Sequence, residues 1–169
     1  MAPRHVLSRT QHIDRTLDDV FDFFSDAANL EPMTPGFLRF RILTPLPITM
    51  QQGTLIDYSL SLFGVPVRWR TRITEWEPGR RFVDEQESGP FAVWKHTHEF
   101  STTPQGRGVH MRDIVEYALP FGFWGSLAHR VAVRSMVHAI FDHRASVVSD
   151  LIARSQKPQS EGSALTGGR

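Results

Sequence analysis

The chain contains no cysteine in its 169 residues. This absence excludes disulfide bridges, a thiolate nucleophile and a zinc site with cysteine ligands. A chain of this length corresponds to one domain and can bury a single sizeable core. Any binding or catalytic chemistry must therefore come from histidine, carboxylate, hydroxyl, basic and aromatic side chains.

An excess of charge of one sign is also absent. The chain has 19 lysine and arginine residues against 18 aspartate and glutamate residues, so its formal net charge is +1. A nucleic-acid-binding protein usually carries concentrated positive charge, so we expect no nucleic-acid partner. The composition defines no oligomeric state.

Long hydrophobic runs are lacking as well. No stretch reaches the roughly 18 apolar residues that indicate a membrane-spanning helix. The first residues, MAPRHVLSRTQHIDRT, contain no apolar core of a secretory signal peptide. We therefore expect a cytoplasmic protein without stable membrane insertion.

Strand-like and helical patterns follow one another in a clear order. Residues 5–13 predict a strand, Thr16 is a predicted N-cap of a helix, and a short second helix is expected over residues 27–31. Alternation of apolar and polar residues then predicts six strands, separated by turn sequences such as EPGR and TPQGRG. Because the connections have hairpin length, the sheet should be antiparallel. The predicted strands cover residues 37–44, 53–62, 66–76, 80–88, 92–102 and 108–119.

A long helix is expected over residues 126–154. Burying about seven large apolar side chains contributes roughly 10–20 kcal/mol before chain entropy is counted, so its apolar stripe must pack on the sheet. Residues 155–169 are rich in serine and glycine and predict a disordered tail. The stripe consists of Leu127, Val131, Val137, Ile140, Phe141, Val148 and Leu151 or Ile152.

These elements predict an α+β domain over residues 4–154. A curved antiparallel seven-stranded sheet wraps around the long C-terminal helix, and two short helices follow the first strand. Because the sheet and the helix need not meet along their whole length, a cavity between them is expected.

Three segments carry a resemblance to a known family: MTPGFLRFRIL, the stretch from GTLIDYSLSL to VWKHTHEF, and DIVEYALPFGFWG. Over residues 4–153 the chain resembles the START-like, or SRPBCC, superfamily of helix-grip proteins, which includes Bet v 1. It is most similar to a bacterial branch related to polyketide cyclases/dehydrases. The resemblance implies a small hydrophobic or amphipathic ligand, such as a lipid, an isoprenoid or a polyketide-like molecule. It does not fix an activity, because one scaffold carries transport, sensing and catalysis.

Strand alternation predicts which side chains face the cavity. In the third of the six strands, arginines occupy alternate positions within residues 68–72, so the opposite face with Trp69 and Ile73 should be inner. In the fifth strand Lys95 and Glu99 favour solvent. The inner residues of that strand are then Trp94, His96, His98 and Phe100.

Hairpin register predicts the neighbours of the two histidines. Symmetric pairing about the turn SGP places Asp84 opposite His96. Symmetric pairing about TPQGRG places Asp113 beside His96 and Met111 beside His98. A slip of one residue would reverse a whole strand. The inner face should therefore hold a polar cluster of Asp84, His96 and Asp113, with His98 at the next inward-facing position of the strand.

This cluster has three interpretations. Two histidines with carboxylates could bind zinc or another divalent ion. Alternatively, His96 or His98 could act as the general base of a cyclase or dehydratase, with Asp84 and Asp113 as orienting groups. The third interpretation, which we adopt, is a hydrogen-bonded patch that orients the polar end of a ligand, without a metal or a cofactor. A weaker option is an interaction module that acts through the outer face of the sheet.

The predicted ligand-binding residues combine aromatic and aliphatic walls with a few polar groups, which is typical of small-molecule sites. They are Phe24, Trp69, Ile73, Gln86, Trp94, His96, His98, Phe100, Met111, Val115, Tyr117, Val137 and Phe141.

Overall fold

The computed structural model describes residues 3–104, 106–120, 127 and 129–155. The predicted beginning of the long helix at Ser126 lies outside these residues. The predicted tail also lies outside them, apart from Ser155, which still belongs to a helix.

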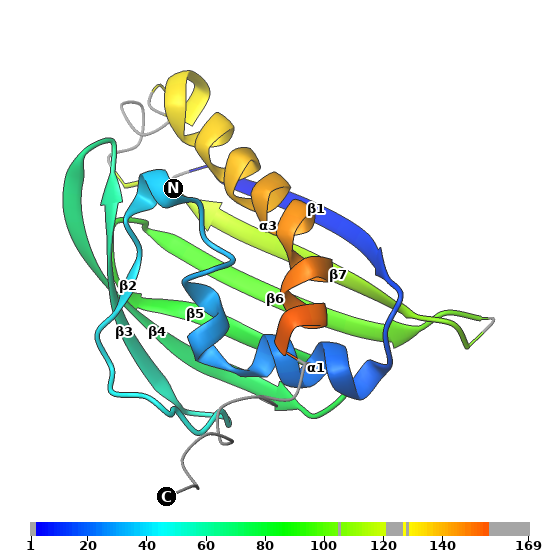
Figure 1. Ribbon diagram of the computed structural model, residues 1–169. Coiled ribbons are helices and arrows are strands. Elements are labelled where there is room, and N and C mark those ends of the chain that lie inside the picture. Colours follow the sequence, from blue (N-terminus) through cyan, green and yellow to red (C-terminus); the bar gives the residue numbers. More distant parts are fainter. Residues whose placement is uncertain (1–2, 105, 121–126, 128, 156–169) are drawn as a thin grey trace, which may run out of the picture.

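Within the described residues, seven strands form one antiparallel sheet in the order β1-β7-β6-β5-β4-β3-β2 (Figure 1). Hairpins link β3 to β7 in sequence, and the first strand pairs with the last, from Arg4 opposite Ala118 to Ile13 opposite Val109. The strands are β1 (Arg4–Ile13), β2 (Arg41–Ile42), β3 (Leu55–Leu62), β4 (Val65–Glu77), β5 (Arg81–Ser88), β6 (Val93–Thr102) and β7 (Val109–Ala118).

The first helix, α1 (Leu17–Ser25), begins where its sequence predicts. The Oγ1 of Thr16 accepts a hydrogen bond from the backbone N–H of Asp19 at 3.2 Å, which satisfies one of the free donors of the first turn. Two short 3-10 turns follow, η1 (Ala27–Leu30) and η2 (Gly36–Leu38). The prediction of a short second helix is therefore confirmed.

The strand predicted over residues 37–44 is wrong for most of its length, because only the two residues of β2 pair with β3. Arg39 adopts a left-handed conformation with φ of 45°, and this ends η2 and interrupts any extended backbone. After β2, the backbone N–H groups of Leu43 and Thr44 both donate to the carbonyl of Asp57. The apparent alternation thus belongs to a loop that follows the edge of the sheet.

The long helix consists of a π-helical turn, η3 (His129–Val133), and α3 (Arg134–Ser155). Most of the predicted stripe of α3 is buried, but Leu127 and Val131 are 45% and 76% exposed. A π-helical turn takes more residues than an α-helical turn, so positions before it and within it fall out of phase with the stripe after it. The buried side at this end of the helix is formed by Val133 and Met136 instead.

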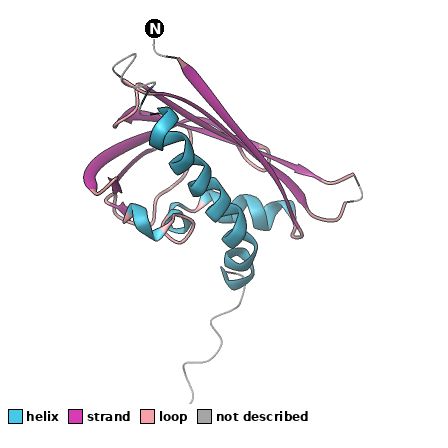
Figure 2. Ribbon diagram, turned by 90° about the horizontal axis from the view of Figure 1, so that it is seen from above, coloured by secondary structure: helices cyan, strands magenta, loops and turns pink. Residues whose placement is uncertain are grey.

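The predicted faces of the sheet are confirmed. Trp69 and Ile73 are 5% and 1% exposed, whereas Arg68 and Arg70 lie exposed on the outer face. The helix α3 lies in the hollow of the curved sheet, and α1 crosses near one end of it (Figure 2).

The core has two apolar clusters. One contains Phe24 and Phe100 near α1, and the other contains Phe141 and the middle of the sheet. The ring of His98 lies 6.3 Å from that of Phe24, and the ring of His96 lies 5.2 Å from that of Phe141, centre to centre. The two histidines therefore lie where the two clusters meet.

Candidate functional site

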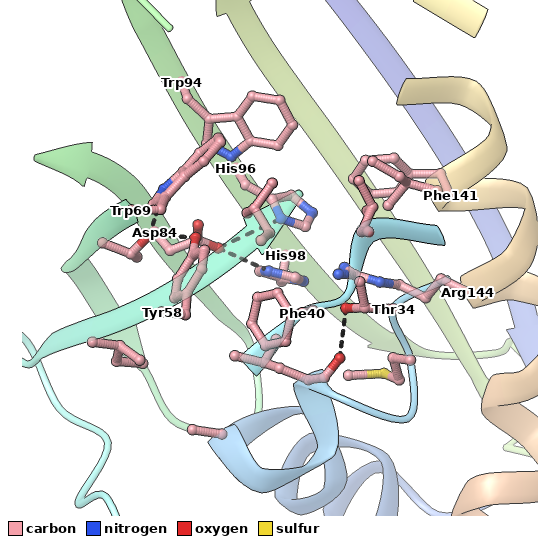
Figure 3. Close-up of a pocket in the computed structure, with 18 of the residues that line it drawn as sticks. Thr34, Phe40, Tyr58, Trp69, Asp84, Trp94, His96, His98, Phe141 and Arg144 are labelled. Carbon is pink, nitrogen blue, oxygen red and sulfur yellow. Dashed lines mark hydrogen bonds and ion pairs between the residues drawn. The ribbon is translucent and has the colours of Figure 1, made fainter. Parts of the chain in front are cut away.

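A cavity of about 140 Å³ lies between the inner face of the sheet, α3 and the segment from α1 to η2. Its wall is mostly aromatic and aliphatic, and its polar side chains gather in one region (Figure 3). These polar residues are Thr34, Tyr58, Thr71, Asp84, His96, His98 and Arg144. The composition is that of a small-molecule site, with an apolar enclosure and a few convergent polar groups.

Two histidines and two aspartates form a closed set of contacts in this wall. His96 lies with Nε2 2.9 Å from Asp113 Oδ1 and with Nδ1 3.5 Å from Asp84 Oδ2. His98 lies with Nε2 3.2 Å from Asp84 Oδ2 and with Nδ1 3.0 Å from Asp113 Oδ1. Each ring therefore bridges the same two carboxylates, and the ring centres are 3.8 Å apart.

The predicted register around this cluster is confirmed in one hairpin and wrong in the next. Asp84 lies opposite His96 as predicted, but Asp113 lies opposite His98 rather than His96. The loop over residues 103–108 is closed by a hydrogen bond between its two end residues, which moves its centre one position toward the C-terminus. The resulting shift of two residues preserves the faces, so Asp113 still points inward and reaches both rings.

The surroundings push the pKa values of the two imidazoles apart. Burial lowers the pKa of His98, but its hydrogen bonds to Asp113 and Asp84 and their charges raise it above its ordinary value. Burial and the charge of His98 hold the pKa of His96 below its ordinary value, despite the same carboxylates.

The two carboxyl groups are ionised under ordinary conditions. Burial raises the pKa of Asp84 and of Asp113, yet the two imidazoles lower both pKa values more strongly, so each lies below its usual range. These shifts favour a proton on His98 over one on His96, beside two carboxylates.

Arg144 is a site residue that the sequence reasoning missed. It comes from α3, lines the cavity and is 8% exposed. Arginine on a helix usually indicates a solvent-facing position. Its spacing was the sequence feature that indicates an inward-facing position, because Arg144 continues the stripe of Val137 and Phe141 toward Val148.

Tyr58 forms a second polar contact at the cavity. Its hydroxyl lies 2.9 Å from Thr71 Oγ1, which also accepts a hydrogen bond from Trp69 Nε1 at 3.2 Å. Burial, reinforced by the charge of Asp84, raises the pKa of Tyr58, so this hydroxyl stays protonated. It can donate or accept one hydrogen bond, but it does not supply a charge.

The structure places most of the predicted ligand-binding residues at the cavity. These are Phe24, Trp69, Ile73, Trp94, His96, His98, Val137 and Phe141, together with Asp84 from the predicted catalytic set.

Other predicted residues lie away from the cavity wall. Phe100 and Met111 pack in the cluster near α1, and Val115 and Tyr117 pack in the cluster against α3. Gln86 exchanges hydrogen bonds with the backbone of residue 91 and so holds the loop between β5 and β6. Alternation identifies the inner face of a strand, but it does not show which part of that face a helix covers. Asp113, from the predicted catalytic set, contacts the two histidines but does not line the cavity.

Three of these side chains could in principle hold a metal ion. One ligand atom each from Asp84, His96 and His98 lies within 4.8 Å of the others. However, Asp84 already makes a hydrogen bond to His98 and an ion-pair contact with His96, and the positive charge of Arg144 acts on Asp84. This set favours the sharing of protons over the binding of a cation, and the absence of a resident metal stays a prediction.

The chain belongs to the family described as polyketide cyclase/dehydrase and lipid transport, whose model matches residues 4–148. No curated protein gives a significant match to the chain. Among the described residues, no helix is both long and apolar enough to cross a bilayer. The cytoplasmic location stays a prediction.

Solved structures show the same fold at low sequence identity. The Zhui aromatase/cyclase from a Streptomyces species has a TM-score of 0.71 and 13% identity, and the match covers 94% of this chain and 99% of that one. A protein from Thermus thermophilus has a TM-score of 0.69 and 17% identity over 92% of this chain and 100% of that one. A START superfamily protein from Mycobacterium smegmatis has a TM-score of 0.62 and 11% identity over 90% and 99%. The helix-grip fold is thus shared, which confirms the predicted fold class.

Proposed function

We propose that the protein binds one small, mainly apolar molecule in the cavity between the sheet and α3. The apolar part of the ligand lies against the aromatic wall, and its polar end lies near His96, His98, Asp84 and Arg144. The observation that carries this proposal is the meeting of these ionisable side chains in a mostly apolar cavity. The family description, which joins cyclases and dehydrases with lipid transport, supports a ligand of this kind.

The size of the cavity limits the ligand. A protein cavity of about 150 Å³ accommodates benzene. The cavity of about 140 Å³ in this protein therefore holds roughly one ring in its present shape. A lipid, isoprenoid or polyketide chain would need half-buried side chains of the wall, such as Phe40 and Met50, to move aside.

A cavity-filling variant tests the proposal, with benzyl alcohol as a neutral one-ring probe. Ile140 is half-buried and lines the cavity, whereas its neighbour Ala139 is exposed on the same helix. Ile140→Trp should weaken binding of benzyl alcohol at least tenfold in ligand-observed NMR, because the indole ring takes the space of the probe. The matched Ala139→Trp variant should bind like the wild type. Equal binding by the two variants would show that the probe lies elsewhere and would overturn the proposal.

The natural ligand can then be sought directly. Native mass spectrometry of the protein purified from its own host should show a retained organic molecule, which the Ile140→Trp variant should not retain. Retention of the same molecule by both proteins would contradict binding in this cavity.

A second candidate function is catalysis by a cyclase or dehydratase. The observation that favours it is the opposite shift of the two histidine pKa values, which provides a neutral base and a protonated acid in one wall. In the dehydration of a β-hydroxy ketone, His96 would take the proton next to the carbonyl. His98 would give its proton to the departing hydroxyl, which leaves as water.

One feature of the geometry weighs against this candidate. Both nitrogens of each ring already lie within 3.5 Å of a carboxylate oxygen. A substrate would therefore reach a histidine only by displacing Asp84, the carboxylate of the pair that lines the cavity.

The two functions are separated by the His96→Asn variant. The aldol adduct of benzaldehyde and acetone serves as substrate, because its dehydration product absorbs in the ultraviolet. An enzyme should lose turnover by about a hundredfold or more. A binding protein should show no turnover in either form and should keep benzyl alcohol within about tenfold, because a neutral hydrogen bond contributes only about 0.5–1.5 kcal/mol.

A further inference from the structure

Arg144 is buried in the cavity wall, and the described residues leave two of its donor atoms without an acceptor. The side chain extends from α3 toward the interior of the cavity (Figure 3). Its Nε and Nη1 atoms are buried, and neither makes a hydrogen bond to any residue that the structure describes. Its ion-pair partner among the described residues is Asp113, whose Oδ1 lies 3.9 Å from Nη1, beyond hydrogen-bond distance.

A guanidinium in this position is costly for the protein alone. It carries five N–H donors and stays charged at all ordinary pH values. A buried donor without an acceptor costs about 1–3 kcal/mol, and more when the group is charged. The ring of Phe141, whose centre lies 5.1 Å from the guanidinium carbon, offsets part of this cost but accepts no conventional hydrogen bond.

The two nearby carboxylates do not accept hydrogen bonds from Nε or Nη1 of Arg144. Asp84 and Asp113 are already joined to the nitrogens of His96 and His98, at distances of 2.9–3.5 Å. With His98 protonated, two positive charges balance two negative charges across the cluster and Arg144. An additional anion therefore meets no net negative charge, and the unused N–H groups of Arg144 are its available donors.

We propose that Arg144 binds the carboxylate of a small aromatic acid whose ring occupies the apolar part of the cavity. This inference rests on the cavity binding proposed above and defines the chemical class of the ligand. A carboxylate supplies acceptors of the charge and geometry that a guanidinium binds best. One aromatic ring fills a cavity of about 140 Å³, and Phe40, Tyr58 and Trp69 supply aromatic wall for it.

The test compares benzoate with benzyl alcohol, which has a similar size but no charge. Wild-type protein should bind benzoate at least tenfold more tightly in isothermal titration calorimetry. Arg144→Met should weaken benzoate binding about ten- to hundredfold, which corresponds to a hydrogen bond to a charged group. The same variant should leave benzyl alcohol unchanged, and Arg144→Lys should restore part of the preference for benzoate.

Arg134 provides the matched control, because it lies exposed at the beginning of the same helix. Arg134→Met should leave both affinities unchanged. The melting temperature gives an independent readout. It should fall in Arg144→Met to the extent that the ion pair with Asp113 contributes to folding. A loss of folding would weaken binding of both probes alike, whereas the proposed role weakens binding of benzoate alone.

The outcomes separate this inference from the proposed function. Binding of benzyl alcohol with no preference for benzoate, or a preference that survives in Arg144→Met, overturns the role of Arg144 and leaves the cavity proposal in place. Absence of binding for both probes overturns both proposals. Benzoate binding that Arg144→Met weakens and Ile140→Trp abolishes supports both.

Discussion

Replacing Asp113 with asparagine should destabilise the protein by removing the charge that both histidines contact. The side chain is 7% exposed and lies 2.9 Å from His96 Nε2 and 3.0 Å from His98 Nδ1. Asp113 makes a hydrogen bond to His96 and an ion-pair contact with His98, and a hydrogen bond that involves a charged group contributes about 1.5–3 kcal/mol. Removing one partner of a buried ion pair costs about 3–5 kcal/mol. We therefore expect the free energy of unfolding to fall by about 3–5 kcal/mol near pH 6.

The loss should depend on pH through His98. In the wild type its pKa is raised above the unfolded value of 6.5. A raised folded pKa contributes stability that is fully present below the unfolded pKa and is lost as pH rises through the folded pKa. In Asp113→Asn the pKa of His98 should fall, because burial remains while one of the two carboxylates that oppose it is gone. The stability difference between wild type and variant should therefore shrink as pH rises from 6 toward 9.

Urea unfolding at several pH values measures the stability difference, and NMR titration of the histidine ring protons measures the pKa of His98. Glu116→Gln is a matched control, because Glu116 lies on the opposite face of the same strand, across from Lys95. The control should change stability by less than about 1 kcal/mol. A loss below about 1 kcal/mol for Asp113→Asn, together with an unchanged His98 pKa, would refute the electrostatic account of the cluster.

Three further predictions concern the cap of the first helix, the loop between β6 and β7, and Asp84. Thr16→Ala should lower stability by about 1 kcal/mol through loss of the helix cap, and an unchanged melting temperature would contradict it. Gly108→Ala should cost more than Gly106→Ala in urea unfolding. Both positions have positive φ, but at Gly108 a new Cβ would lie 2.7 Å from the carbonyl oxygen of Ile13, whereas at Gly106 it would meet open space. The lowered pKa of Asp84 contributes stability that is present above its unfolded value of 3.8 and is lost as pH falls through the folded pKa. The stability difference between wild type and Asp84→Asn should thus shrink in acid, and a constant difference would argue against an ionised Asp84.

The sequence predicted the inner face of the strands but not the shape of the cavity. His96 and His98 point inward because Lys95 and Glu99 on the same strand favour water, and this preference acts locally along one strand. Phe100 lies on the same face as His98, yet it is covered by packing near α1 instead of lining the cavity. Which part of a face a distant helix covers depends on packing between residues far apart in the chain.

The strand pairing in the last hairpin is a second feature that the sequence pattern could not predict. Alternation carries a period of two, so it cannot distinguish pairings that differ by two residues. The hydrogen bonds of the loop over residues 103–108 decided that Asp113 lies opposite His98.

The sequence by itself determined the order of the elements, the capped first helix and the inward direction of the two histidines. These features follow from local patterns and from the preference of charged side chains for water. The sequence also predicted that Asp84 and Asp113 lie near the histidines. Only the tertiary structure brought Arg144 to this cluster, because α3 meets β5 and β7 there only when the sheet curves around the helix. The burial of Arg144 is the clearest case. Its place on a helix was visible in the sequence, but the lack of acceptors for Nε and Nη1 among the described residues depends on what the fold places around them.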